Sequence, residues 1–116
     1  MTNLATKNSD NLREIILEGL SDGKASDLKV FEVRDLTTIA DYMVIATGTS
    51  TRQVKALSQR VSTLVKDAGY LVHGIEGEIG YEWVLVDAGD VLVHIMHPDT
   101  RAFYQLERLW EGHVGT

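Results

Sequence analysis

The strongest constraint on the fold of this chain is a pair of β-prone runs separated by a short turn that contains glycine. Residues 81–87 form the first run and residues 90–97 the second, with Ala88 and Gly89 between them. Runs of this kind around a two-residue turn predict a β-hairpin. The chain must therefore contain a β-sheet in which these two strands are neighbours.

The expected register of the hairpin separates its side chains into two sides, because side chains alternate along a strand. With Ala88 and Gly89 as the loop, Asp87 faces Asp90 at a cost in charge repulsion, which calls for an exposed tip or a cationic partner. The first side is β-branched and is expected in the core: Val84, Val86, Val91, Val93 and Ile95. The second side consists of Tyr81, Trp83, Leu85, Leu92, His94 and Met96.

The second side of the hairpin has two interpretations, and the sequence leaves both open. In the first, the sheet is covered on both faces and Trp83 packs beneath a helix. In the second, the side is an aromatic binding patch, because tryptophan, tyrosine and methionine are enriched at the centres of protein interfaces. Residues 67–100 contain no lysine or arginine. Their seven carboxylates predict one acidic end that attracts a basic partner: Asp67, Glu76, Glu78, Glu82, Asp87, Asp90 and Asp99.

Length and composition indicate one globular domain. The 116 residues are 44% hydrophobic and 24% charged, so we expect a single domain over 1–116 with polar tails at 1–9 and 111–116. No apolar run approaches the roughly 20 residues that span a bilayer, and the polar N-terminus lacks the features of a signal peptide. A cytoplasmic protein without a membrane partner is expected. The net charge of −6 argues against direct binding to DNA, and the absence of cysteine excludes disulfides and zinc–thiolate sites.

The remaining patterns predict an α/β protein (mixed α+β) with a mixed five-stranded sheet. An amphipathic helix follows Ser9 and a longer one follows Ser50, which stands at capping-box spacing from Gln53. Further strands are expected at 28–34, 42–47 and 70–75. A terminal helix opens at Pro98, with a buried stripe of Phe103, Leu106 and Trp110. The order is helix, two strands, helix, three strands, helix.

Motifs for chemistry are weak. Gly48-Thr49-Ser50 precedes a helix, where free amides attract phosphate, but the lysine of a P-loop and the three glycines of a dinucleotide site are absent. We interpret this junction as a capped turn. His94 and His97 point to opposite faces of a strand, so we expect no metal site. No serine or threonine stands in a nucleophile elbow, and we expect neither catalytic residues nor a cofactor.

Four segments of the chain resemble those of a known protein family and occur in the same order. They are Ala40 to Val54, Gly74 to Gly77, Trp83 to His94 and Arg101 to Trp110. Together they resemble the ribosomal silencing factor family, RsfS or Iojap-like, over Leu12 to Trp110. The chain departs mildly from the family pattern at Ala88, where an aromatic residue is common, and at Met96, where phenylalanine is common.

The resemblance implies a nucleotidyltransferase-like topology and a translational repressor rather than an enzyme. Such a factor binds the large ribosomal subunit through large-subunit ribosomal protein fourteen and keeps the small subunit from joining when nutrients are scarce. Members are usually homodimers when free. Combined with the hairpin, it predicts a partner-binding or dimer surface of Glu76, Glu78, Tyr81, Trp83, Leu85, Asp87, Asp90, Leu92, His94 and Met96.

Two other classes of function remain as alternatives. A magnesium-dependent nucleotidyltransferase-like enzyme would use Gly48-Thr49-Ser50 together with Glu76-Gly77-Glu78, although these segments are far apart in sequence. A plain dimeric scaffold would bury Trp83 in an interface with a second copy. Gel filtration and a pulldown on large subunits distinguish the scaffold from a ribosome-binding factor.

Overall fold

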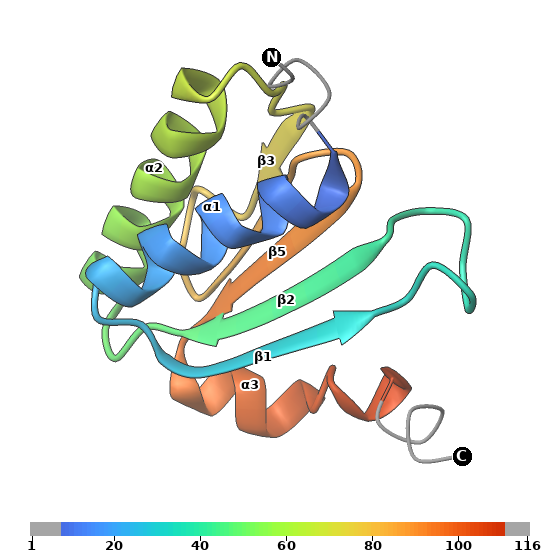
Figure 1. Cartoon of the computed structure of the whole chain (residues 1–116). Coiled ribbons are helices and arrows are strands. Elements are labelled where there is room, and N and C mark those ends of the chain that lie inside the picture. The colour runs from blue at the N-terminus through green and yellow to red at the C-terminus, as the bar shows by residue number, and fades with distance from the viewer. Residues whose placement is uncertain (1–7, 111–116) are drawn as a thin grey trace.

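The computed structural model describes residues 8–110, which form one five-stranded mixed sheet with helices on both faces (Figure 1). The elements follow the predicted order: α1 (Ser9–Asp22), β1 (Ser26–Glu32), β2 (Tyr42–Thr47), α2 (Thr51–Asp67), β3 (Gly74–Glu76), β4 (Trp83–Asp87), β5 (Val91–Met96) and α3 (Pro98–Tyr104). The mixed α/β class is thus confirmed. The expected tails lie outside the described residues, except for Asn8, which caps α1, and Ser9, which belongs to α1 and is buried. No helix within 8–110 has the length and apolar character needed to cross a membrane.

The strands lie in the order β1-β2-β5-β4-β3. Only β2 and β5 are parallel, and the other neighbours are antiparallel. All six residues of β2 are buried, which agrees with its unbroken apolar run and with a central position. The edge strand β3 is shorter than predicted and covers only 74–76. Tyr70, where the strand was expected to begin, is still hydrogen-bonded to Val65 at the end of α2.

Each face of the sheet carries its own hydrophobic core. The first core lies beneath α1 and α2 and contains the five β-branched residues of the hairpin, all of them fully buried as predicted. The second core lies on the opposite face, on the side of α3 (Figure 1), and consists of Phe31, Val33, Met43, Ile45 and Met96. Leu106 and Trp110 pack against this second core. The sheet is therefore covered on both faces, but the second cover is smaller.

The hairpin turns one residue later than predicted. Ala88 donates a hydrogen bond to the carbonyl of Val91, so the two loop residues are Gly89 and Asp90. Gly89 has a φ of 84°, which favours glycine at the first loop position. Asp87 consequently faces Leu92 instead of Asp90, and Trp83 faces Met96. A shift of two in the pairing leaves the side chains of β4 and β5 on their predicted faces.

The new register also removes the expected repulsion between the two aspartates. The side chain of Asp87 accepts a hydrogen bond from the amide of Gly89 at 2.9 Å. Asp90 is exposed at the tip of the hairpin. The prediction of facing carboxylates was wrong, because the positive φ of Gly89 decides where the chain turns.

The terminal helix is interrupted, which corrects the predicted stripe. α3 ends at Tyr104, and Gln105 adopts a left-handed conformation with a φ of 47°. A stripe through Phe103, Leu106 and Trp110 requires an unbroken helix. The break turns Phe103 outward, where 78% of it is exposed, whereas Leu106 and Trp110 still reach the second core.

A buried arginine fastens α3 to the sheet. The guanidinium of Arg101 donates to the carbonyl of Asp27 at 2.6 Å and to the hydroxyl of Thr47 at 2.8 Å. It also forms an ion pair with Glu107 at 3.1 Å. These contacts hold α3 across the ends of β1 and β2, so the helix does not extend over β3.

The junction before α2 is a capped turn, as interpreted from the sequence. Ser50 caps the helix by accepting from the amide of Gln53 at 3.1 Å. The side chain of Gln53 accepts from the amide of Thr49 at 2.7 Å and donates to the carbonyls of Gly23 and Lys24. Gln53 therefore connects the turn after α1 to the start of α2.

Candidate protein-docking surface

The β3 side of the second face is the part that α3 leaves open. Glu76, Leu85 and His94 stand opposite one another across β3, β4 and β5 and therefore point to the same face. Trp83 lies two residues before Leu85 and shares that face. A cavity of about 260 Å³ is lined by Glu76, Gly77, Trp83, Leu85 and His94, and we call it the Trp83 pocket.

A hydrogen bond between two side chains holds the indole of Trp83 in place. Nε1 of Trp83 donates to Nδ1 of His94 at 2.9 Å. Because indole is only a donor, Nδ1 of His94 carries no proton and the imidazole is neutral. Burial lowers the pKa of His94 to about 4, so the acceptor is present throughout the neutral range. The indole is thereby oriented by a group that lies beneath the surface.

Two aromatic residues of α3 extend the exposed surface beyond the strands. The ring of Tyr104 lies 4.9 Å from that of Trp83, and the ring of Phe103 lies 4.9 Å from that of Tyr104. Tyr104 is 55% exposed. We define Trp83, Leu85, Phe103 and Tyr104 as the aromatic surface. A contiguous exposed apolar area of this kind marks a docking site more often than isolated apolar residues do.

Sequence reasoning missed Phe103 as an exposed residue and did not select Tyr104. A signal for them exists in the chain. Consecutive helical residues are about 100° apart around the axis, so Phe103 and Tyr104 cannot both lie at the centre of one buried stripe. Two adjacent aromatic residues on a short helix therefore indicate that at least one of them faces away from the core.

The structure gathers Glu76, Trp83, Leu85 and His94 at the Trp83 pocket, and Leu92 is half-buried against the second core. Four of the selected residues lie away from this pocket: Tyr81, Asp87, Asp90 and Met96. Met96 is fully buried in the second core, where a partner cannot contact it.

Tyr81 is separated from the aromatic surface by a change in backbone direction. Its φ of 56° ends the strand alternation before β4. The ring packs against the first core, on the opposite face from Trp83, and Nζ of Lys55 lies 5.6 Å from its centroid. The predicted pairing of Tyr81 with Met96 does not form, because β4 begins only at Trp83.

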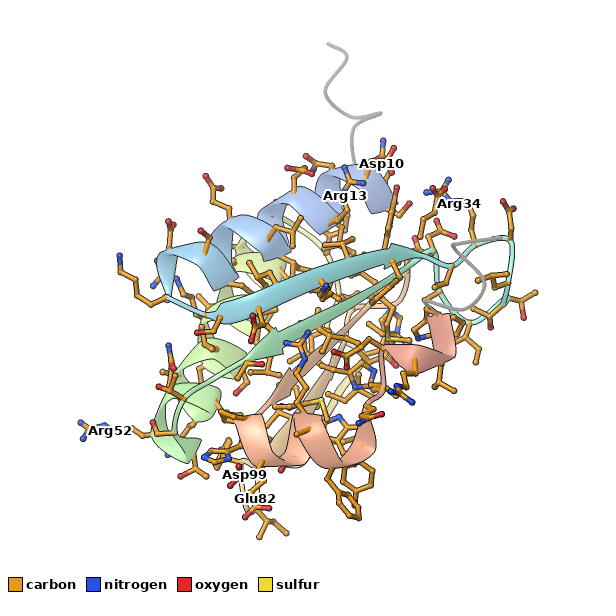
Figure 2. All side chains as sticks on the ribbon, turned by 90° about the horizontal axis from the view of Figure 1, so that it is seen from below. Asp10, Arg13, Arg34, Arg52, Glu82 and Asp99 are labelled. Atoms are coloured by element: carbon orange, nitrogen blue, oxygen red, sulfur yellow. The ribbon has the colours of Figure 1, made fainter. Side chains whose placement is uncertain are left out.

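The carboxylates of residues 67–100 do not form one acidic end, which corrects that prediction. Glu82 and Asp99 lie together where β4 begins and α3 starts (Figure 2), and the amide of His97 donates to the carbonyl of Glu82. Asp87 and Asp90 lie at the opposite end of the hairpin, about 17 Å away along the strand. Glu78 is exposed in the turn between β3 and β4. Of these residues, Glu76 lines the Trp83 pocket, Glu78 follows it in the next turn, and Glu82 and Asp99 lie where β4 and α3 begin.

A second polar cluster lies at the end of the sheet opposite Glu82 and Asp99 (Figure 2). The hydroxyl of Tyr42 donates to the carboxylate of Asp10 at 2.5 Å. This hydrogen bond lowers the pKa of Asp10 and raises the pKa of Tyr42. The guanidinium groups of Arg13 and Arg34 lie 4.8 Å and 5.2 Å from the Tyr42 ring. The cluster connects α1 to β2 and has a structural role.

The two segments considered for an enzyme lie apart in the sheet. Gly48-Thr49-Ser50 follows β2, whereas Glu76-Gly77-Glu78 follows β3, and β5 and β4 lie between them. Three strand spacings amount to about 14 Å, too far for one metal ion to contact both segments. Within residues 8–110, no group of three or more histidine, aspartate or glutamate side chains is placed to hold a metal ion.

Fold and surface together define a small mixed α/β domain with an open aromatic sheet face. Residues 6–114 match the family described as "Ribosomal silencing factor during starvation". The chain is 45% identical over 101 residues to Ribosomal silencing factor RsfS of Chromobacterium violaceum, covering 87% of this chain and 83% of that protein. The protein therefore belongs to the ribosomal silencing factor family, which confirms the resemblance.

Two further comparisons agree with this membership. A crystal structure of a protein from Chromobacterium violaceum superposes with a TM-score of 0.87 at 43% identity, covering 89% of this chain and 86% of that one. The mouse protein named "Mitochondrial assembly of ribosomal large subunit protein 1" is 36% identical over 103 residues. That match covers 84% of this chain and 44% of the mouse protein.

Proposed function

We propose that this protein silences ribosomes by binding the large subunit through large-subunit ribosomal protein fourteen. Bound there, it excludes the small subunit and represses translation when nutrients are limiting. Membership of the silencing-factor family supports this proposal, and the name of the mouse relative points to the large subunit. The structural observation that carries it is the aromatic surface beside Glu76, Glu78, Glu82 and Asp99.

The aromatic surface has the chemistry that a basic protein partner requires. Interfaces commonly derive most of their affinity from a few central aromatic residues, and Trp83 and Tyr104 are suited to this role. Ribosomal proteins are generally basic, so the surrounding carboxylates steer association and exclude acidic partners. An interface of standard size, about 800 Å² per partner, would suffice for stable docking.

The proposed mechanism involves no bond chemistry. A body of 12.9 kDa on the joining surface prevents association of the subunits by occupying space. We assign the protein no catalytic activity and no cofactor, and we place it in the cytoplasm with the ribosomes. The free protein is proposed to be a homodimer that covers its aromatic surface with a second copy, so ribosome binding and self-association compete.

The test is sedimentation of the purified protein with separated ribosomal subunits in a sucrose gradient. We expect the protein to travel with the large subunit and to lower the fraction of joined ribosomes without consuming nucleotide. Asp90→Asn is the matched control for Glu76→Gln, because it also removes one carboxylate but does so at the tip of the hairpin. Magnesium-dependent turnover of a nucleoside triphosphate, lost in Glu76→Gln, would instead favour the enzyme.

A further inference from the structure

The Trp83 pocket has apolar walls and a carboxylate at its rim. Trp83 and Leu85 are half-buried and line the pocket beside His94, while Glu76 is exposed. Gly77 has a φ of 95°, and a Cβ atom at this position would collide with the carbonyl of Trp83. No side chain from this point of the chain can therefore fill the pocket.

The pocket is small, and its volume accommodates one long side chain. Sites for small molecules usually measure roughly 300–1,000 Å³. The Trp83 pocket, at about 260 Å³, falls below this range. It lies at the edge of the aromatic surface, so a residue inserted from a docked protein would reach it.

The charge around the pocket is uncompensated by the protein itself. Within residues 8–110, Glu76 forms no ion pair. The lining contains no cation, and the nearby sequence from Asp67 to Thr100 supplies none. Lys55 is engaged with Tyr81 on the opposite face of the sheet. The nitrogen of Trp83 is already bonded to His94, so the only charged group offered to a ligand here is the carboxylate of Glu76.

We propose that the Trp83 pocket receives one arginine side chain of the protein partner. Its aliphatic stem lies against Trp83 and Leu85, and its guanidinium binds the carboxylate of Glu76. Arginine fits this arrangement because its planar cation stacks on aromatic rings, pairs with a carboxylate through two hydrogen bonds and is weakly hydrated. This assignment rests on the proposed docking of a basic protein. It adds that an arginine of that protein is the residue bound in the pocket.

The pocket can be tested without a ribosome by NMR titration of the full chain. The probes are N-acetyl-arginine methylamide, its lysine counterpart and N-acetyl-citrulline methylamide, which has nearly the shape of arginine without its charge. We expect the arginine probe to shift the indole signal of Trp83 and the methyl signals of Leu85 in a saturable manner. Trp83→Phe identifies the indole signal by its loss.

The effect of charge is measured on two variants that remove one carboxylate each. We expect Glu76→Gln to weaken binding of the arginine probe about tenfold, as for loss of a charge-assisted hydrogen bond. Asp90→Asn, at the hairpin tip, should leave it unchanged. Unchanged heteronuclear spectra away from the pocket show that each variant is folded.

Three outcomes overturn the proposal. If the citrulline probe binds as well as the arginine probe, the pocket recognises apolar shape and not charge. If the lysine probe binds more tightly, the pocket belongs to a different cation. If no probe gives a saturable shift, there is no site. The proposed function is tested separately by sedimentation. Probe binding without ribosome binding contradicts the silencing function alone, and ribosome binding without probe binding contradicts the arginine site alone.

Discussion

Trp83 contributes both to packing and to the exposed surface. One part of the indole packs against the second core and is fixed by His94, and another part lines an open pocket. The sheet is covered on both faces, as the first interpretation of the hairpin's second side predicted, but a pocket stays open beside Trp83. The second interpretation, a binding patch, stays a prediction. A tryptophan whose nitrogen already has a partner offers a docking protein apolar ring area at little cost in side-chain entropy, because its orientation is fixed in advance.

Replacing Trp83 with alanine should weaken binding to the large subunit far more than Asp87→Asn or Asp90→Asn. Loss of a central aromatic anchor costs about 2–4 kcal/mol, or roughly 30- to 1,000-fold in affinity. The two aspartates lie at the far end of the hairpin and should alter mainly the association rate. Affinity is measured by sedimentation or surface binding, with melting temperature as the folding control. Full binding by a destabilised variant would assign Trp83 to the core alone.

The buried His94 should make the free energy of unfolding depend on pH. The imidazole is neutral in the folded protein with a pKa of about 4, whereas in the unfolded chain it has its ordinary value of about 6.5. Between these two pKa values the unfolded state binds one proton more than the folded state. The contribution of His94 to the free energy of unfolding is therefore complete above pH 6.5 and is lost as the pH falls toward 4. The group alone accounts for about 3 kcal/mol over this window.

Urea unfolding of the wild type and of His94→Gln between pH 7 and pH 4 checks this dependence. Glutamine keeps an oxygen that can accept from Trp83 but does not titrate. The variant should therefore lose less stability over the window than the wild type does. Parallel curves for the two proteins would show that His94 is solvated and that its pKa is not lowered.

At the scale of elements, the interruption of α3 determines which side chains form the surface. Gln105 adopts a left-handed backbone conformation, and Arg101 holds the preceding turn against β1 and β2. Phe103 and Tyr104 consequently face solvent next to Trp83, while Leu106 returns to the second core. A short helix thus covers one half of a sheet face and adds two aromatic rings to the other half.

Phe103→Ala and Leu106→Ala should separate docking from packing on the two sides of this break. Phe103 is 78% exposed, so its loss should change the free energy of unfolding by no more than about 0.5 kcal/mol. Leu106 is partly buried, and its loss should cost roughly 1–3 kcal/mol. Chemical denaturation measures both, and only Phe103→Ala should weaken subunit binding without destabilisation. If Phe103→Ala proved more destabilising than Leu106→Ala, the prediction of one continuous buried stripe would be favoured instead.

For the whole molecule, two helices cover most of one face of the sheet and α3 covers part of the other. The first core accounts for most of the buried apolar side chains. An aromatic area of this size is seldom left wet on a small protein. In the proposed function, self-association and ribosome binding compete for this surface.

The free protein should therefore behave as a homodimer whose dissociation favours ribosome binding. Light scattering at micromolar concentration is expected to give twice the mass of one chain, falling on dilution. Tyr104→Glu, which places a charge in the aromatic surface, should shift the protein to a monomer, whereas Asp90→Asn should not. A monomer at all concentrations contradicts the shared-surface proposal, and a dimer unaffected by Tyr104→Glu assigns self-association to another face.

The sequence by itself determined the order of the helices and strands and the faces of the hairpin. These features depend on local periodicity, capping and turn preference, which neighbouring residues encode together. Val84 and Ile95 are buried as predicted because a shift of two in register does not change a residue's face. Four segments spread along the chain were sufficient to indicate the family.

Only the tertiary structure decided the register of the hairpin, the burial of Met96, the turn of Tyr81 to the opposite face and the exposure of Phe103. Each depends on where a distant segment packs or on a single residue with positive φ. Sequence periodicity shows that a side chain requires cover, but it does not show which element provides the cover or how far that element reaches. The open pocket beside Trp83 exists because Arg101 holds α3 over β1 and β2, a contact between residues far apart in the chain.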